Sequence, residues 1–217
     1  MTAEHHKPWQ PLPLRHVAAL FEGAPFPWWI AGGHAIECFV GRALRPHGDI
    51  DVLLLRRDRE QAREWLADWD CWAADPPGTL RRWPRGEALG AAVSDVWCRE
   101  PGSSAWRLQL MLDDGDDHEW RSRHCAAVSR PLPALGFHTA DGVPVLAPEV
   151  QLFYKARQPR PKDEADLAAA LPRLDPARIA WLRQAIITAY GPHNDWLGRL
   201  GDFGSVGPVS DSVLRGN

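Results

Sequence analysis

The most informative stretch of the chain is residues 28–55, which read WWIAGGHAIECFVGRALRPHGDIDVLLL. Its first apolar run, residues 28–31, predicts a short buried strand that ends at the pair Gly32-Gly33. Residues 35–40 can form one short helix, which the following glycine closes. Residues 50–55 are apolar and β-branched at their start, so they predict a second buried strand. The stretch therefore predicts a strand, a glycine turn, a helix and a strand, in that order.

Two acidic residues stand at the start of the second predicted strand. Side chains alternate along a strand, so we expect Asp49 and Asp51 to point to the same face. Carboxylates held side by side repel each other, and burial beside an apolar strand increases that cost. Mg²⁺ removes the conflict, because it binds one or two carboxylates together with phosphate oxygens and water. We therefore predict that Asp49 and Asp51 hold one or two Mg²⁺ ions.

Four further residues of this stretch suit a phosphate group. Gly32 and Gly33 let the backbone approach an anion closely, and a helix that opens at His34 points its first amide groups at the same place. Arg45 and His47 add hydrogen-bond donors beside the carboxylates. Together these residues predict a site for a metal-bound nucleoside triphosphate, either ATP or another nucleotide.

The composition limits the class of protein. Of the 217 residues, 45% are hydrophobic and 24% are charged, which is typical of a globular protein in water. No apolar run reaches the roughly 18 residues of a membrane span, and the polar residues 1–10 do not resemble a signal peptide. The net charge of −3 argues against a nucleic-acid partner. The four cysteines are far apart in sequence, so we expect reduced thiols in a cytoplasmic protein.

The remaining periodicity divides the chain into parts. Residues 1–145 mix predicted helices with strands, including strands at 93–98 and 105–112. Residues 146–200 read as helices separated by prolines, and residues 201–217 form a Gly/Ser-rich tail that we expect to be flexible. The predicted fold class is α+β, with a small mixed sheet flanked by helices and followed by a C-terminal helical part.

Two longer motifs resemble one known family. The first joins WWIAGGHA to Gly41-Arg42 and to the pattern Arg45-x-His47-x-Asp49-Ile50-Asp51. The second comprises DGVPVLAPEVQL at residues 141–152, followed by Lys155-Ala156 and by Lys162-Asp163-x-x-Asp166-Leu167. Both motifs resemble the polymerase-β-type nucleotidyltransferase superfamily, and within it the aminoglycoside and lincosamide nucleotidyltransferase-like branch. The resemblance covers about residues 10–200.

The resemblance implies an enzyme that transfers a nucleoside monophosphate to a hydroxyl of a small molecule, such as an aminoglycoside or lincosamide antibiotic. The hydroxyl attacks the α-phosphate of a nucleoside triphosphate, and pyrophosphate leaves. Asp49 and Asp51 match the catalytic pair that holds the metal. Such a protein is expected to be a monomer or a homodimer. The residues matched to nucleotide binding are Gly32, Gly33, Arg45, His47 and Lys155, the last from the helical part. The alternative interpretation of Lys155 is an ordinary surface lysine of a helix.

One position departs from the family pattern. Many members carry a third carboxylate on a later strand, and Gln109 takes that position here. Because a glutamine cannot act as a base at neutral pH, the alternative function is a catalytically impaired nucleotide- or drug-binding protein on the same fold. The other carboxylates that can be considered as a base are Asp113, which requires a different strand register, Glu149 and Asp163.

An acidic cluster at residues 113–119 follows this strand. Its Asp-Asp-Gly-Asp sequence predicts a turn at residues 113–116, with carboxylates that face solvent. A second interpretation is that the cluster attracts a cationic substrate such as an aminoglycoside.

Overall fold

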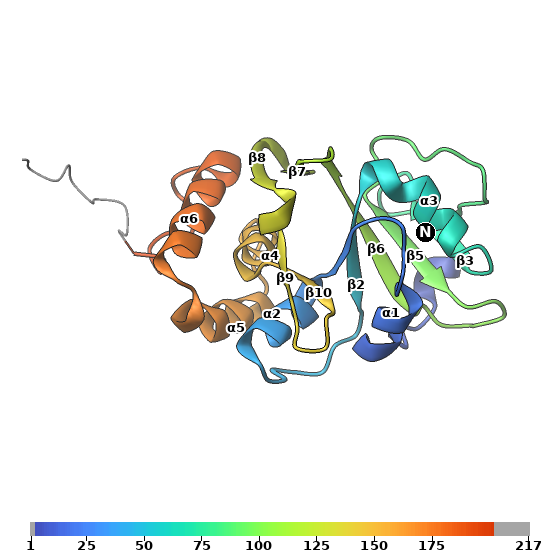
Figure 1. Cartoon of the computed structure of the whole chain (residues 1–217), viewed down its shortest axis with the longest axis horizontal. Coiled ribbons are helices and arrows are strands. Elements are labelled where there is room, and N and C mark those ends of the chain that lie inside the picture. The colour runs from blue at the N-terminus through green and yellow to red at the C-terminus, as the bar shows by residue number, and fades with distance from the viewer. Residues whose placement is uncertain (1–2, 202–217) are drawn as a thin grey trace, which may run out of the picture.

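The computed structural model describes residues 3–201, and within this range a single mixed sheet contains ten strands (Figure 1). The main path of the sheet runs β4-β3-β5-β6-β2-β1-β10-β9, with β7 beside β6 and β8 beside β7. Parallel and antiparallel pairs both occur, so the predicted α+β class is confirmed. The strands are β1 (Trp28–Ile30), β2 (Asp51–Leu55), β3 (Asp70–Ala74), β4 (Leu80–Arg82), β5 (Asp95–Arg99), β6 (Leu108–Gly115), β7 (Glu119–Ser122), β8 (Cys125–Pro131), β9 (Gly136–His138) and β10 (Pro144–Leu146).

The helices gather mainly at one end of this sheet. In Figure 1, α4, α5 and α6 lie together beside α2, whereas α3 lies near β3 and β5 at the other end. The α-helices are α1 (Leu14–Leu20), α2 (Gly32–Val40), α3 (Arg59–Trp65), α4 (Pro148–Lys155), α5 (Pro161–Ala170) and α6 (Pro176–Tyr190). Short 3₁₀ segments occur at Ala3–His6, Arg56–Asp58, Leu132–Ala134 and Leu171–Arg173.

Strand β2 lies inside the sheet and positions the aspartate pair. It pairs antiparallel with β1, with Ile30 opposite Val52, and parallel with β6, with Asp51 opposite Gln109. Residues 52–55 are fully buried, because both faces of a central strand are covered. The register therefore places Gln109 beside Asp51, as the sequence pattern predicted.

Several predicted boundaries were wrong. Helix α2 begins at Gly32 rather than at His34, although it ends as predicted at Gly41, whose φ of +70° is left-handed. The turn predicted at residues 113–116 starts too early, because pairing with β7 extends β6 to Gly115. Strands β3, β4, β9 and β10 were not predicted. They are short and are fixed by distant partners, as in the parallel pairing of β10 with β1.

The remaining predictions concern the cysteines, membrane spans, the division into domains and the C-terminal tail. The four cysteines are free thiols. No helix within residues 3–201 is long and apolar enough to cross a membrane. Strand β10 belongs to the sheet and ends at Leu146, next to the predicted boundary between the two parts of the chain. The division into domains at residues 1–145 and 146–200 stays a prediction. Except for Gly201, the predicted tail lies outside the described residues.

Candidate functional site

A cavity of about 370 Å³ lies between the sheet and the C-terminal helices. A volume of this size suits a small-molecule ligand. One side of it is formed by Asp49 and Asp51 at the start of β2, and we call these residues, together with Gln109 and Asp95 behind them, the sheet wall. Of the seven predicted site residues, the lining includes six: Gly32, Gly33, Arg45, Asp49, Asp51 and Lys155.

The two aspartates of the sheet wall that line the cavity, Asp49 and Asp51, have no ion-pair partner among the described residues. Neither Asp49 nor Asp51 forms an ion pair or hydrogen bond through its carboxylate with another side chain among residues 3–201. Burial and the neighbouring carboxylates of Asp49 and Asp95 raise the pKa of Asp51 to about 7. The charged form of Asp51 is thus disfavoured until a cation binds beside it, and the all-oxygen donor set is the kind that Mg²⁺ prefers.

A residue missed from the sequence, Asp95, completes this group of carboxylates. On the central strands, Asp51 lies opposite Gln109, and on the neighbouring pair Asp95 lies opposite Met111, so these side chains share one face of the sheet. The Gln109 Nε2 group donates a hydrogen bond to Asp95 Oδ1 at 2.8 Å. The glutamine at the third-carboxylate position therefore holds a carboxylate from the next strand.

The glycine pair is required by side chains that pack directly on its backbone. Gly32 has a φ of +67°, and a Cβ atom there would lie 2.1 Å from Asp51 Oδ2. A Cβ atom at Gly33 would lie 2.3 Å from His47 Cε1 and 2.5 Å from Arg45 Nη2. These positions favour glycine even without a ligand, because any larger residue displaces the predicted site side chains.

The first amide of α2 has a protein partner. Gly32 N donates to Oε1 of the buried Gln151 side chain at 2.7 Å, which ties the glycine turn to α4. Sequence reasoning missed Gln151, because its partner lies 119 residues away. The predicted anion site at the start of α2 therefore depends on the amides that follow Gly32.

His47 lies behind the cavity rather than in its lining, where it forms part of what we call the loop clamp: Glu37, Arg45 and His47. Arg45 Nη1 lies 3.0 Å from His47 Nδ1, and His47 Nε2 lies 2.9 Å from Glu37 Oε1. The same Glu37 oxygen accepts hydrogen bonds from the amides of Leu44 at 2.7 Å and Arg45 at 3.2 Å. The clamp fixes the loop that leads into Asp49.

His34, Glu37 and His47 are the one group of three or more His, Cys, Asp or Glu residues in residues 3–201 whose possible metal-ligand atoms all lie within 4.8 Å of one another. The centroid of the His34 ring lies 4.0 Å from that of His47, with 33° between the ring planes, so the two imidazoles contact each other. Arg45 donates to His47 Nδ1, which leaves the proton of a neutral His47 on Nε2, facing Glu37. These contacts favour a structural role for the group.

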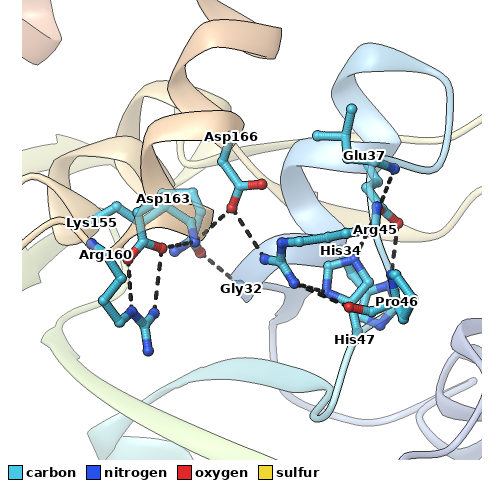
Figure 2. Close-up of polar contacts among 12 residues, drawn as sticks. Gly32, His34, Glu37, Arg45, Pro46, His47, Lys155, Arg160, Asp163 and Asp166 are labelled. Atoms are coloured by element: carbon cyan, nitrogen blue, oxygen red, sulfur yellow. Dashed lines mark hydrogen bonds and ion pairs between the residues drawn. The ribbon is translucent and has the colours of Figure 1, made fainter.

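The opposite side of the cavity, which we call the helical wall, carries Lys155, Arg157, Arg160, Lys162 and Asp163. Lys155 is buried and its Nζ lies 2.7 Å from Asp163 Oδ1 and 2.9 Å from Asp166 Oδ2 (Figure 2). Arg160 adds a second cation on Asp163 at 2.7 Å. Hydrogen bonds from Arg160 and Lys155 outweigh burial and hold the pKa of Asp163 well below its usual range.

Figure 2 shows Asp166 between Lys155 and Arg45, and this buried carboxylate connects the two sides of the site. Arg45 Nη2 lies 3.3 Å from Asp166 Oδ2. Lys155 is therefore no surface lysine: it lines the cavity, and at least one of its three N–H groups remains for a ligand.

Two carboxylates considered as a base from the sequence lie outside this lining. Asp113 is fully buried, and its oxygens accept hydrogen bonds from Trp120 at 2.7 Å, Tyr154 at 2.6 Å and Arg123 at 2.7 Å. Glu149 is also fully buried and lies 2.7 Å from Arg130 Nη1. Both carboxylates have structural partners.

Asp163, the third candidate, lines the cavity but is held by Lys155 and Arg160. Asp95 lies behind the lining, but it acts electrostatically on Asp51 and has one side-chain partner among the described residues, the neutral Gln109, so it is the candidate that we retain for the proton acceptor.

Comparisons with known proteins match this fold. Residues 13–75 match the sequence model of the Aminoglycoside-2''-adenylyltransferase family. No curated protein sequence matches the chain significantly. The family model covers the glycine turn, the loop clamp and the aspartate pair, so the resemblance predicted from the first motif is confirmed.

Solved structures agree with this match. The solution structure of the antibiotic-resistance factor ANT(2'')-Ia has a TM-score of 0.52 and 20% identity over 82% of this chain and 90% of its own. The lincosamide antibiotic adenylyltransferase LnuA with bound lincomycin has a TM-score of 0.51 and 16% identity over 75% and 96%. A crystal structure of ANT(2'')-Ia with adenylyl-2''-tobramycin has a TM-score of 0.50 and 17% identity over 79% and 94%. The chain therefore has a nucleotidyltransferase-like fold and is distantly similar to antibiotic adenylyltransferases.

Proposed function

We propose that the protein transfers a nucleoside monophosphate from ATP, or another nucleoside triphosphate, to a hydroxyl group of a small molecule. One observation carries this proposal: Asp49 and Asp51 lie without an ion-pair partner, among the described residues, in a cavity whose other side is rich in cations. Unneutralised carboxylates facing cations suit a metal-bound polyphosphate, which brings positive charge to the first wall and negative charge to the second.

Asp49 and Asp51 are the residues that would hold Mg²⁺. Their oxygen donors fit a hard cation, and the raised pKa of Asp51 indicates that its charged form needs a neutralising partner. When bound, the cation supplies charge neutralisation for the triphosphate and for the oxygens that gain charge during transfer.

The chain's own residues then bind and orient the nucleotide. Lys155 and Arg45 present N–H donors toward the phosphates, while Asp163 and Asp166 hold the Lys155 ammonium in place. The acceptor hydroxyl oxygen bonds to the α-phosphorus as the bond to the pyrophosphate oxygen breaks, and pyrophosphate leaves with that electron pair. Asp95, held by Gln109, accepts the proton of the hydroxyl.

The relatives suggest which acceptors to test first. LnuA is described with bound lincomycin and ANT(2'')-Ia with adenylyl-2''-tobramycin, so a lincosamide and an aminoglycoside are the reference acceptors. The second candidate function, a nucleotide- or drug-binding protein without turnover, is favoured by Gln109, since no carboxylate stands directly beside Asp51 on β6.

Pyrophosphate release separates the two functions. The protein is incubated with Mg²⁺, each of the four common nucleoside triphosphates and each reference acceptor. Turnover that Asp49→Asn abolishes supports the enzyme. Mg²⁺-dependent nucleotide binding without pyrophosphate release on the reference acceptors, or on sugars that carry a phosphate or a carboxylate, supports the binding protein. If Asp49→Asn and Asp51→Asn leave nucleotide binding unchanged, the site assignment is wrong.

The same assay tests the role of Asp95. We expect Asp95→Asn to lower kcat by about 10²-fold or more with little change in nucleotide KM, because it removes a proton acceptor and leaves the binding groups in place. Asp68→Asn, an exposed substitution outside the cavity, is the matched control. An Asp95→Asn variant with wild-type kcat would remove Asp95 from the mechanism.

A further inference from the structure

The cavity lining has more positive than negative side chains. It contains three carboxylates, those of Asp49, Asp51 and Asp163. Six cationic side chains surround them: Arg45, Arg123, Lys155, Arg157, Arg160 and Lys162.

Most of these charges are already committed to one another. Asp163 is shared by Lys155 and Arg160, so it has no capacity left for a cationic ligand. Arg123 Nη1 lies 2.7 Å from Oδ1 of the buried Asp113, so Arg123 also has an anionic partner within the protein. By contrast, Arg157 and Lys162 form no ion pair or hydrogen bond through their side chains with the described part of the chain. Once Mg²⁺ occupies the aspartate pair and the triphosphate lies against Arg45 and Lys155, Arg157 and Lys162 are the lining cations that still lack a partner among the described residues, and no lining carboxylate is left unpaired.

The acidic cluster at residues 113–119 does not change this balance. The sequence left open whether it attracts a cationic substrate, but its carboxylates have arginine partners. A surface that is already neutralised exerts little attraction on a distant cation. The pairs are Asp114 with Arg56 at 2.7 Å, Asp116 with Arg121 at 3.1 Å, Asp117 with Arg57, and Glu119 with Arg121 at 2.8 Å.

Arg157 lies in a different part of the cavity from the loop clamp. It acts electrostatically on His124 and Tyr190, which belong to the β7–β8 turn and the end of α6, whereas Arg45 acts on His34 at the start of α2. Partial burial and the charges of Arg123 and Arg157 lower the pKa of His124 to about 4. Arg123 and Arg157 therefore place positive charge beside His124, which lines the same cavity.

We propose that the acceptor carries an oxyanion, a phosphate or a carboxylate, which Arg157 binds with the help of Lys162. This proposal rests on the proposed function and narrows its acceptor. It excludes polycationic aminoglycosides, which would need several free carboxylates in the cavity. Arg157 can present two parallel N–H groups to an oxyanion, and Lys162 adds a point charge.

Calorimetric titration of the full chain tests the proposal without requiring turnover. The protein is first loaded with Mg²⁺ and α,β-methylene-ATP, whose P–C–P linkage cannot break, so that the phosphate sites are filled. Four probes with similar hydroxyl groups follow: glucose, glucose 6-phosphate, glucuronic acid and glucosamine. We expect both anionic probes to bind at least about tenfold more tightly than glucose, and glucosamine more weakly than glucose. The tighter anionic probe identifies the preferred oxyanion.

Charge reversal at Arg157 assigns the preference to a residue. We expect Arg157→Glu to remove the tenfold advantage of the anionic probes. Arg173→Glu, an equal charge change at an exposed arginine outside the cavity lining, is expected to keep it.

Three outcomes overturn the proposal. They are equal affinity for all probes, tightest binding of glucosamine, and an Arg157→Glu variant that loses the nucleotide analogue as strongly as the sugar phosphate. Failure of the α,β-methylene analogues of all four common nucleoside triphosphates to bind with Mg²⁺ would instead contradict the proposed function itself.

Discussion

The carboxylates on the two sides of the cavity differ in their ion-pair partners and in the direction of their pKa shifts. On the helical wall, Asp163 has two cationic partners and a pKa well below its usual range. On the sheet wall, Asp51 has none among the described residues, and its pKa is raised to about 7. Both residues border the same space, so the difference comes from their neighbours. A carboxylate paired within the protein stabilises the fold, whereas one left unpaired beside others is available to a ligand.

The largest expected effect comes from removing charge from the sheet wall. We expect Asp49→Asn and Asp51→Asn each to lower kcat/KM for nucleotidyl transfer by about 10³-fold, because they remove a ligand of the cation that stabilises charge on the phosphates. Neither change breaks an ion pair of the described residues, so the unfolding midpoint in urea should not fall. Steady-state kinetics and urea titration measure the two quantities. A variant that unfolds more easily and keeps its activity would reverse the assignment of the two walls.

The opposite pattern is expected for the helical wall. Lys155→Met leaves the buried carboxylates of Asp163 and Asp166 without their shared cation, which costs about 3 kcal/mol of unfolding free energy. Lys162→Met is the matched control in the same cavity, and we expect it to change stability by less than about 0.5 kcal/mol. Urea denaturation followed by tryptophan fluorescence measures both. Equal stability of the two variants would show that Lys155 is no structural cation.

The sequence predicted the sheet wall better than the helical wall for a physical reason. Alternation along a strand and the spacing of Gly32, Gly33, Asp49 and Asp51 are local, so they can be read without knowing the fold. The match of Gln109 to the third-carboxylate position came from the resemblance to the family, and the register of β6 on β2 places it beside Asp51. Lys155 was found, but its ties to Asp163 and Asp166 depend on how two helices pack.

The contacts that were not predicted join segments that lie far apart in the sequence. Asp95 could be placed on a predicted strand, but only the register of β5 on β6 brings it to the Gln109 amide. Gln151 lies inside the second family-like motif, yet nothing local indicates that it accepts a hydrogen bond from Gly32. Strand order and register are set by the packing of the whole sheet, which local patterns do not contain.

A smaller effect tests how tightly the backbone of Gly32 packs against the side chain of Asp51. Gly32→Ala combines a left-handed φ of +67° with a Cβ atom only 2.1 Å from Asp51 Oδ2. Gly23→Ala is the matched control, because Gly23 has a similar φ of +73° and nothing within 4 Å of its Cβ position. We expect Gly23→Ala to cost about 1 kcal/mol of unfolding free energy and Gly32→Ala about 2 kcal/mol. The difference, measured in urea, reports the contact with Asp51. Identical values would mean that the carboxylate moves away freely.

The smallest effect concerns the positive end of the cavity. In the folded protein the pKa of His124 lies at about 4, below the ordinary histidine value of 6.5, so the unfolded chain binds more protons between these two values. Stability should therefore fall as the pH is lowered from 6.5 toward 4. Arg157→Ala removes one of the charges that lower this pKa, so the native titration midpoint should rise and the pH dependence should weaken. Proton NMR of the His124 ring measures the midpoint, with Arg173→Ala as the control. A wild-type titration midpoint near 6.5 would contradict the inference that Arg123 and Arg157 place positive charge beside His124.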